Sequence, residues 1–341
     1  MEPAGTGAPR ARAILGSVAA RLRRAGRARQ ALLVLLLYLA VAFLLYAMPI
    51  AADLASRYVG VGKSDSKLYL WSLAWLPYAL AHGLSPFETL RVFAPGGADL
   101  TWVTTLPVPA LLLWPVTALA GPLAAYNLLL LLAPALAGWA TFLLCRRVTD
   151  RFWPSVAGGY LFGFSTYMVA QLHGHANLVL IWPAPFCAYL VVRRVAGDLG
   201  RLPFVAGVAG SLLFLFGSST ELFATTTLFG VIAFAGALAF GGARIRRPTF
   251  EAGLLVAAAY AIVGLLVSPF LLQAFGNLPG APIRPIDRAS VDLLSFVVPR
   301  TSTLVGGARW AGVTARFTSS IVEDGGYLGG LVVVLALALW T

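Results

Sequence analysis

A run of 18 residues without a charged side chain, residues 31–48, is the feature that most restricts how this chain can fold. A helix of that length can cross the hydrocarbon core of a bilayer, and it exceeds the apolar part of a typical secretory signal. We therefore expect an uncleaved first span. Similar apolar runs follow at 122–145, 152–172, 176–192, 202–216, 222–240, 252–275 and 327–340.

The composition agrees with a chain that spans a membrane several times. Of its 341 residues, 59% are hydrophobic and only 11% are charged, so no water-soluble fold could cover the apolar surface. The sequence predicts an all-α polytopic membrane protein with about eight spans in one module, residues 31–341. Cys145 and Cys187 lie inside apolar runs, which argues against a disulfide framework or a cysteine-ligated metal.

Two apolar segments differ from ordinary membrane spans. Residues 106–120 are short and contain three prolines. A full span there would place the arginines of residues 146–151 on the outer side, so we expect a partly inserted segment instead. The last run, 327–340, has no polar exit after it, and we expect the natural chain to extend beyond residue 341.

Basic residues are distributed unevenly around these spans. Residues 1–30 hold seven arginines, with Ile14, Leu15, Val18 and Leu22 at helical spacing, which predicts a cytoplasmic tail whose second half lies on the anionic leaflet. With this orientation, 16 of the 25 basic residues but only 4 of the 13 acidic residues are cytoplasmic. The whole +12 excess then lies inside, which is typical of a multi-pass cell-membrane protein and not of a nucleic-acid-binding surface.

The first outer loop, residues 50–105, contains the leading catalytic candidate. Asp65 lies between Lys63 and Lys67, the only lysines in the chain, just before an aromatic, amphipathic segment that we expect to form an interfacial helix. A carboxylate held there beside cations suits an enzyme acting on a lipid phosphate, although such loops also carry solvated charge without a role. Asp53, which directly follows the first span, is the second candidate.

Four further polar residues of the outer side lie in one turn, QLHGHAN. Two histidines two residues apart on a helix point to different faces, so they share a ligand only if Gly174 breaks the helix. Substrate hydrogen bonding, metal ligation and simple solvation all stay open here. The residues concerned are Gln171, His173, His175 and Asn177.

Three charged residues further along are candidates for substrate binding, each with a structural alternative. Glu221 could contact substrate or simply occupy the first turn of a helix after SST. Arg300, in the outer loop 276–326, could bind a phosphate or lie along the membrane surface. Glu323 could bind an acceptor or a divalent cation, or mark a polar turn. No Walker, dinucleotide-binding or HExxH motif supports nucleotide hydrolysis or zinc proteolysis.

With these residues in place, the chain resembles the GT-C superfamily of integral-membrane glycosyltransferases, which includes protein O-mannosyltransferases and lipid A aminoarabinose transferases. The resemblance covers nearly all of residues 31–275. Its features are an Asp in the first outer loop, here Asp65, and the segments KLYLWSLAWLPYALAHG, AGPLAAYN, LLCRRVTDR and QLHGHANL.

This resemblance implies a GT-C-like helical bundle with interfacial helices on the outer face and a polyprenyl-phosphate-linked sugar as donor. It gives Asp65 the role of general base toward an acceptor hydroxyl on a glycan, lipid or protein. Lys63 and Lys67 become partners for the lipid phosphate. Many members have paired acids in this loop, whereas Ser64 and Ser66 flank Asp65, which leaves metal dependence and the choice of base open.

The donor carries its own leaving group, so such an enzyme needs a base for the acceptor and cations for the departing phosphate, and attack opposite the phosphate inverts the anomeric carbon. Two other classes stay open. A transporter or flippase would place its polar groups near mid-span and often show repeated halves. A non-catalytic membrane scaffold would tolerate loss of Asp65.

The charge distribution predicts which loops face outward. In a variant without native cysteines, Ser64→Cys and Ser302→Cys should react with a membrane-impermeant thiol reagent in intact cells. Ala243→Cys should stay unlabelled, because it lies beside three arginines of the inner side. Labelling of Ala243→Cys with silence at Ser64→Cys would reverse the topology.

Overall fold

The computed structural model of the protein describes residues 7–53, 56–59, 64–280, 291–300, 303, 305–317, 326–327, 329 and 338, with side chains from residue 25 onward, Ser64 excepted. Lys63, Glu323 and nearly all of the predicted last span, 327–340, lie outside the described residues.

The described chain is mostly helical, as the sequence predicts. Two strands of two residues, β1 (Glu88–Thr89) and β2 (Ala98–Asp99), pair antiparallel in a hairpin with Glu88 opposite Asp99. Short π or 3₁₀ turns cover Phe43–Ala47, Met48–Asp53, Leu293–Phe296 and Ala308–Trp310. The α-helices are α1 (Gly7–Ala42), α2 (Ser64–Ala81), α3 (Pro107–Leu112), α4 (Trp114–Thr149), α5 (Phe152–Gly163), α6 (Thr166–Gln171), α7 (Pro183–Val195), α8 (Arg201–Phe216), α9 (Thr220–Phe240), α10 (Ala243–Leu266), α11 (Ser268–Gly276) and α12 (Ala311–Thr314).

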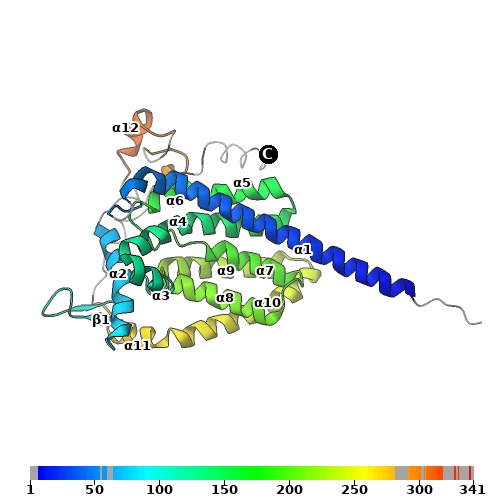
Figure 1. The fold of residues 1–341 in the computed structure, drawn as a ribbon, viewed down its shortest axis with the longest axis horizontal. Coiled ribbons are helices and arrows are strands. Elements are labelled where there is room, and N and C mark those ends of the chain that lie inside the picture. Colours follow the sequence, from blue (N-terminus) through cyan, green and yellow to red (C-terminus); the bar gives the residue numbers. More distant parts are fainter. Residues whose placement is uncertain are drawn as a thin grey trace, which may run out of the picture.

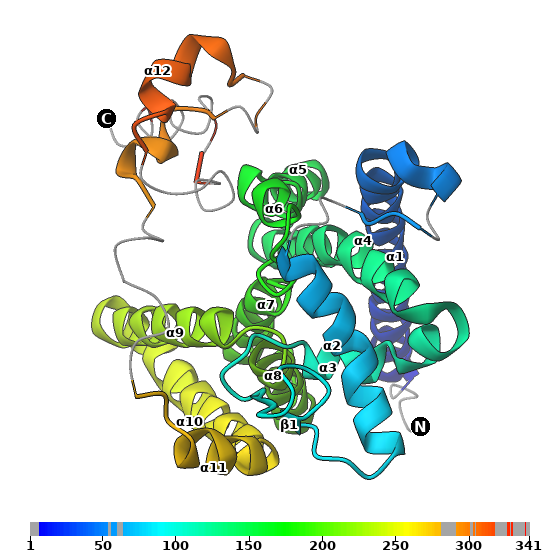
Figure 2. The ribbon, with the colours of Figure 1, turned by 90° about the vertical axis from the view of Figure 1, so that its left-hand side faces the viewer.

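The long helices form a bundle, and α2 lies across one end of it (Figure 1). The hairpin projects beyond α2 at this end, whereas the first half of α1 extends past the opposite end. Viewed from the α2 end, α2 crosses in front of the bundle and the segment bearing α12 lies to one side (Figure 2). The segment predicted to be an interfacial helix therefore runs across the bundle axis.

Four helical segments of the described chain are long and apolar enough to cross a membrane. They are Ala25–Asp53, Trp114–Thr149, Thr220–Phe240 and Ala243–Leu266. The helix Arg201–Phe216 is apolar but shorter. The other predicted spans differ from the expectation in ways that local sequence explains.

The predicted boundary between the tail and the first span does not coincide with the end of a helix. One continuous helix, α1, runs from Gly7 to Ala42 through the expected boundary at residue 30. Nothing in this stretch stops a helix, because it contains no proline after Pro9 and its glycines are isolated.

The predicted spans 152–172 and 176–192 are also broken. Ser165 caps α6 by accepting a hydrogen bond from the Met168 amide at 3.3 Å, which separates α6 from α5. The stretch 172–182 is not helical, and α7 begins only at Pro183, because proline favours the first helical position and disfavours helix before it. Its apolar residues fill the core without helix, with Val179 and Leu180 almost fully buried.

Prolines also shift two other boundaries. Residues 106–120 contain α3 and the start of α4, and α4 is kinked directly afterwards at Gly121, whose φ of 84° is left-handed. The six residues of α3 span about 9 Å, far short of a bilayer, and the Ser72 hydroxyl of α2 accepts a hydrogen bond from the Leu106 amide. The predicted span 252–275 starts earlier, in α10, and is interrupted at Val267 before α11.

The helix α4 lies at the centre, packed against α1, α2, α5 and α7. Its contact with α5 depends on small residues, which let two backbones approach closely. A Cβ added to Gly163 of α5 would lie 2.5 Å from the Pro134 carbonyl oxygen and 2.6 Å from the Gly138 nitrogen of α4. Gly159, one turn earlier, is similarly confined by Gly138 and Tyr38.

This packing predicts that Gly163→Val lowers the stability of the bundle. The added side chain must push α5 from α4, which should cost about 1–3 kcal/mol and lower the thermal unfolding midpoint of detergent-purified protein. Gly230→Val on α9 is the control, because no heavy atom lies within 4 Å of a Cβ built there. Equal midpoints for the two variants would contradict the close approach of α4 and α5.

Candidate functional site

The leading catalytic candidate, Asp65, lies in the first turn of α2. A carboxylate is favoured there because the first turn presents unpaired amide groups and the positive end of the helix dipole. The Asp65 Oδ2 atom lies 3.4 Å from the His175 Nε2 atom. The Asp65 side chain is 41% exposed and that of His175 is 23% exposed, so the carboxylate remains accessible from one side.

His175 connects Asp65 to a second polar group. Its Nδ1 atom lies 2.8 Å from the Gln171 Oε1 atom, so both ring nitrogens face oxygens. A protonated imidazole donates to both oxygens, whereas a neutral one requires the Gln171 amide to turn and donate to Nδ1. In both arrangements the Nε2 atom carries a proton and faces the Asp65 carboxylate.

A second contact lies one helical turn further along α2. The Tyr69 hydroxyl donates to the Asn177 Oδ1 atom at 2.6 Å, and both side chains are buried. Asp65 and Tyr69 are four residues apart and therefore share a helix face. Their partners His175 and Asn177 are two residues apart in the irregular segment 172–182. These two contacts fix the position of α2 relative to this segment.

The helix α4 holds the other side of the α2 start. The Asn127 side chain accepts a hydrogen bond from the Val59 amide at 2.8 Å and donates to the Arg57 carbonyl at 3.0 Å. The neighbouring Tyr126 hydroxyl shares a hydrogen bond with Ser66, whose side chain is fully buried. These roles cannot be predicted from the sequence, because no local pattern links residues so far apart in the chain.

The other first-loop candidates lie at the surface. Asp53 forms an ion pair with Arg57 at 3.2 Å, and both side chains are exposed. Lys67 is exposed on α2, two residues after Asp65. Asp53 thus occupies the position expected of a residue that marks the end of the first apolar helix.

The two histidines of QLHGHAN contact different groups. The helix α6 ends at Gln171, so the chain is not helical at Gly174. The His173 Nδ1 atom nevertheless lies 2.7 Å from the Val169 carbonyl oxygen, four residues earlier, and not beside His175 and its partners. Within the described ranges, no group of three or more His, Cys, Asp and Glu side chains could hold a metal ion.

Gln171 and Asn177 were predicted to bind substrate, and the structure gives them a different place. Both are only 5% exposed, and their side chains contact His175 and Tyr69 respectively. Buried amides of this kind hold neighbouring groups in position and cannot be reached by a substrate without rearrangement. In this conformation the two amides support His175 and Tyr69, and their assignment to substrate binding stays a prediction.

The remaining candidates lie in other segments. Glu221 is exposed in the first turn of α9, where Ser219 caps the helix by accepting from the Leu222 amide. This is the helix-start alternative that the sequence allows. The Arg300 guanidinium lies over the Phe317 ring at 5.0 Å and is 8% exposed. Arg300 therefore packs within its own segment.

The hairpin covers the second half of α2. Trp75 and Leu100 share a buried cluster, and the Trp102 indole donates to the Ala274 carbonyl of α11 at 3.1 Å. Burial acts to raise the pKa of Asp99, but hydrogen bonds from Thr101 and Asn277 outweigh it and hold the pKa below its ordinary value. The cavity between the hairpin, α2 and α11 measures about 30 Å³, room for one water molecule and not for a sugar.

A family profile described as "Domain of unknown function (DUF6311)" matches residues 35–341. The chain therefore belongs to the DUF6311 family. No curated protein and no solved structure shows significant similarity to the chain.

The Asn127 contacts generate a prediction about the approach to α2. Asn127→Leu keeps a similar volume but leaves the Val59 amide and Arg57 carbonyl without their partner, which costs about 1–3 kcal/mol locally. Hydrogen–deuterium exchange at Val59 should become at least about tenfold faster. Thr141→Val on the same helix is the control, since its hydroxyl donates to the Ala137 carbonyl within α4. Unchanged exchange at Val59 would contradict the proposed hold.

Proposed function

We propose that this DUF6311 protein is a polytopic membrane glycosyltransferase of the GT-C type. In this proposal it moves a sugar from a polyprenyl-phosphate donor to an acceptor hydroxyl on the extracytoplasmic face of the cell membrane. The observation that carries the proposal is the pairing of Asp65 with His175 at the end of the bundle where α2 lies. A partly exposed carboxylate held by a buried polar framework is suited to act as a base.

The proposed reaction uses Asp65 as the general base. The carboxylate accepts the proton of the acceptor hydroxyl, and the oxygen attacks the anomeric carbon of the donor sugar. The bond from that carbon to the phosphate oxygen breaks, and the polyprenyl phosphate leaves with the electron pair. Attack opposite the phosphate inverts the configuration. Lys63 and Lys67 are proposed to stabilise the charge on the departing phosphate.

His175 acts on Asp65 in this scheme and not on the substrate. Its Nε2 atom faces one carboxylate oxygen at 3.4 Å and holds the carboxylate in place. Gln171 fixes the imidazole ring, and Tyr69 with Asn177 fixes the helix that bears Asp65. These contacts orient the base before the acceptor arrives, which favours proton transfer. His173 remains a candidate for contact with donor or acceptor.

The orientation proposed for the bundle follows from its two ends. Arginines near the ends of α4 and α7 and in the first turns of α10 are assigned to the cytoplasm, and the α2 end to the outer side. The polar contacts around Asp65 gather at one end of the bundle. A transporter or flippase would need such groups near mid-span, so these contacts favour an enzyme.

The test measures lipid-linked sugars in cells that lack the protein and in the same cells complemented with it. The unused donor should accumulate in their membranes, and complementation with the parent protein should remove it. Asp65→Asn should insert normally, bind the donor and lose transfer by at least about a hundredfold, because the shape remains and the base is gone.

Asp53→Asn is the matched control, since Asp53 is an exposed carboxylate of the same loop paired only with Arg57 among its described ion-pair contacts. It should keep most activity. His175→Ala should fall between the two. Loss of transfer in Asp53→Asn with near-normal Asp65→Asn would mean that the base is misassigned. Normal transfer in both variants would refute the first-loop mechanism.

A further inference from the structure

An apolar groove runs between α1 and α5, away from the Asp65 site. Its volume is about 290 Å³, and it is lined by Leu37, Tyr38, Val41, Trp153, Val156, Ala157 and Tyr160. The Tyr38 hydroxyl donates to the Val156 carbonyl at 2.7 Å, so this polar group of the lining already has a partner. Trp153 is 75% exposed and Leu37 is 47% exposed. The groove therefore offers apolar surface that the described chain does not cover.

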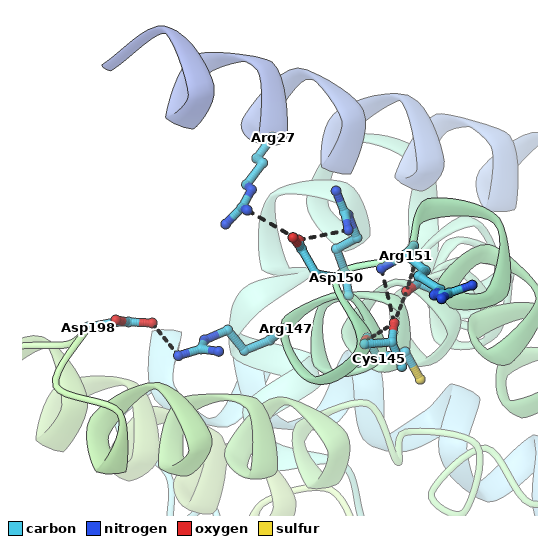
Figure 3. Close-up of polar contacts among 9 residues, drawn as sticks. Arg27, Cys145, Arg147, Asp150, Arg151 and Asp198 are labelled. Atoms are coloured by element: carbon cyan, nitrogen blue, oxygen red, sulfur yellow. Dashed lines mark hydrogen bonds and ion pairs between the residues drawn. The ribbon is translucent and has the colours of Figure 1, made fainter. Parts of the chain in front are cut away.

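Arginines lie near one end of this groove. Arg151 directly precedes α5, two residues before Trp153. Arg27 lies eleven residues before Tyr38 on α1, about three helical turns, and therefore on nearly the same face. Asp150 accepts from Arg27 at 3.2 Å and from Arg146 at 2.9 Å (Figure 3). Three arginines with one carboxylate leave two positive charges at this end.

The turn that bears Arg151 is held firmly. The Thr149 hydroxyl donates to the Cys145 carbonyl at 2.8 Å and accepts from the Arg151 amide at 3.2 Å. The Ser155 hydroxyl donates to the Arg151 carbonyl at 2.5 Å (Figure 3). The Arg151 guanidinium, by contrast, forms no ion pair with any described residue. The backbone is thus fixed while an exposed cation remains available to an anion.

We propose that the crevice between α1 and α5 binds one anionic phospholipid, with an acyl chain in the groove and the phosphate at Arg151, beside the Arg27–Asp150 pair. The apolar lining fits a hydrocarbon chain, and the net positive charge beside it fits one phosphate group. The Arg27–Asp150 pair is exposed on both sides, so it contributes little on its own and can be shared with a phosphate at small cost.

This inference needs the chain to lie in a membrane but does not depend on its activity. A lipid held there would join α1 to α5 and would complete a surface that protein atoms leave open. A zwitterionic lipid could fill the groove equally well, but it would gain less from the arginines. The charge near the groove therefore predicts a preference for lipids with an anionic headgroup. The apolar groove predicts that an acyl chain must fit into it.

The test uses the purified full chain in detergent with phosphatidylglycerol or phosphatidylcholine of identical acyl chains. Native mass spectrometry should detect one retained phosphatidylglycerol and little phosphatidylcholine. Arg151→Gln should reduce this preference about fivefold, as expected for one basic residue near a phosphate. Ala157→Trp, which fills the groove, should abolish retention of both lipids. Leu37→Trp fills it from the α1 side and serves if Ala157→Trp fails to fold.

Matched controls are an exposed arginine and an exposed alanine elsewhere. Arg201→Gln at the start of α8 and Ala235→Trp on α9 should retain phosphatidylglycerol like the parent. Equal retention of the two lipids by the parent would overturn the proposal, as would full retention by both groove-filling variants. Displacement of the bound phosphatidylglycerol by polyprenyl phosphate would make the groove a donor-lipid site instead and would also overturn it.

Discussion

The close approach of α4 and α5 is the packing interaction on which most of the bundle depends. Gly138, Gly159 and Gly163 have no side chains, and a Cβ at any of them would meet atoms at 3.0 Å or less. The two helices can therefore touch through their backbones, which places α4 in contact with α1, α2 and α7 as well. A bulkier α5 would displace the helix that connects both ends of the molecule.

Because α4 is central, its two halves support different surfaces. Near one end, Tyr126 and Asn127 hold the start of α2 and the chain that leads to it. At the other end, Arg146 and Asp150 connect α4 to Arg27 of α1, while Arg147 pairs with Asp198 at 2.6 Å (Figure 3). One end is organised by buried neutral hydrogen bonds and the other by exposed ion pairs. Buried neutral hydrogen bonds fix the positions of the groups that they join, whereas in an exposed ion pair another anion can easily replace the carboxylate.

The irregular segment 172–182 explains how a polar site can exist inside an apolar fold. Its backbone forms only local turns, with the His175 amide donating to the Gln171 carbonyl and the Leu178 amide donating to the His175 carbonyl. Side chains then provide the long-range contacts, because His175 and Asn177 reach Asp65 and Tyr69. A regular helix through this segment could not present both residues to one face of α2. The local break in the helix is thus what brings the polar groups together.

The sequence by itself determined the helical character of the chain and pointed to the two residues of the central contact. Hydropathy and the scarcity of charge predicted an all-helical chain with membrane-length apolar helices, and the loop position of Asp65 and the QLHGHAN turn marked both partners of the central contact. Apolar runs did not reveal where helices stop, so prolines and serine caps overruled the predicted spans 152–172, 176–192 and 252–275. Only the tertiary structure decided that Asp65 meets His175 and not His173, and that Gln171 and Asn177 are buried supports. The reason is physical: hydrophobicity is a property of each segment alone, whereas a hydrogen bond between residues more than a hundred positions apart depends on how the helices pack.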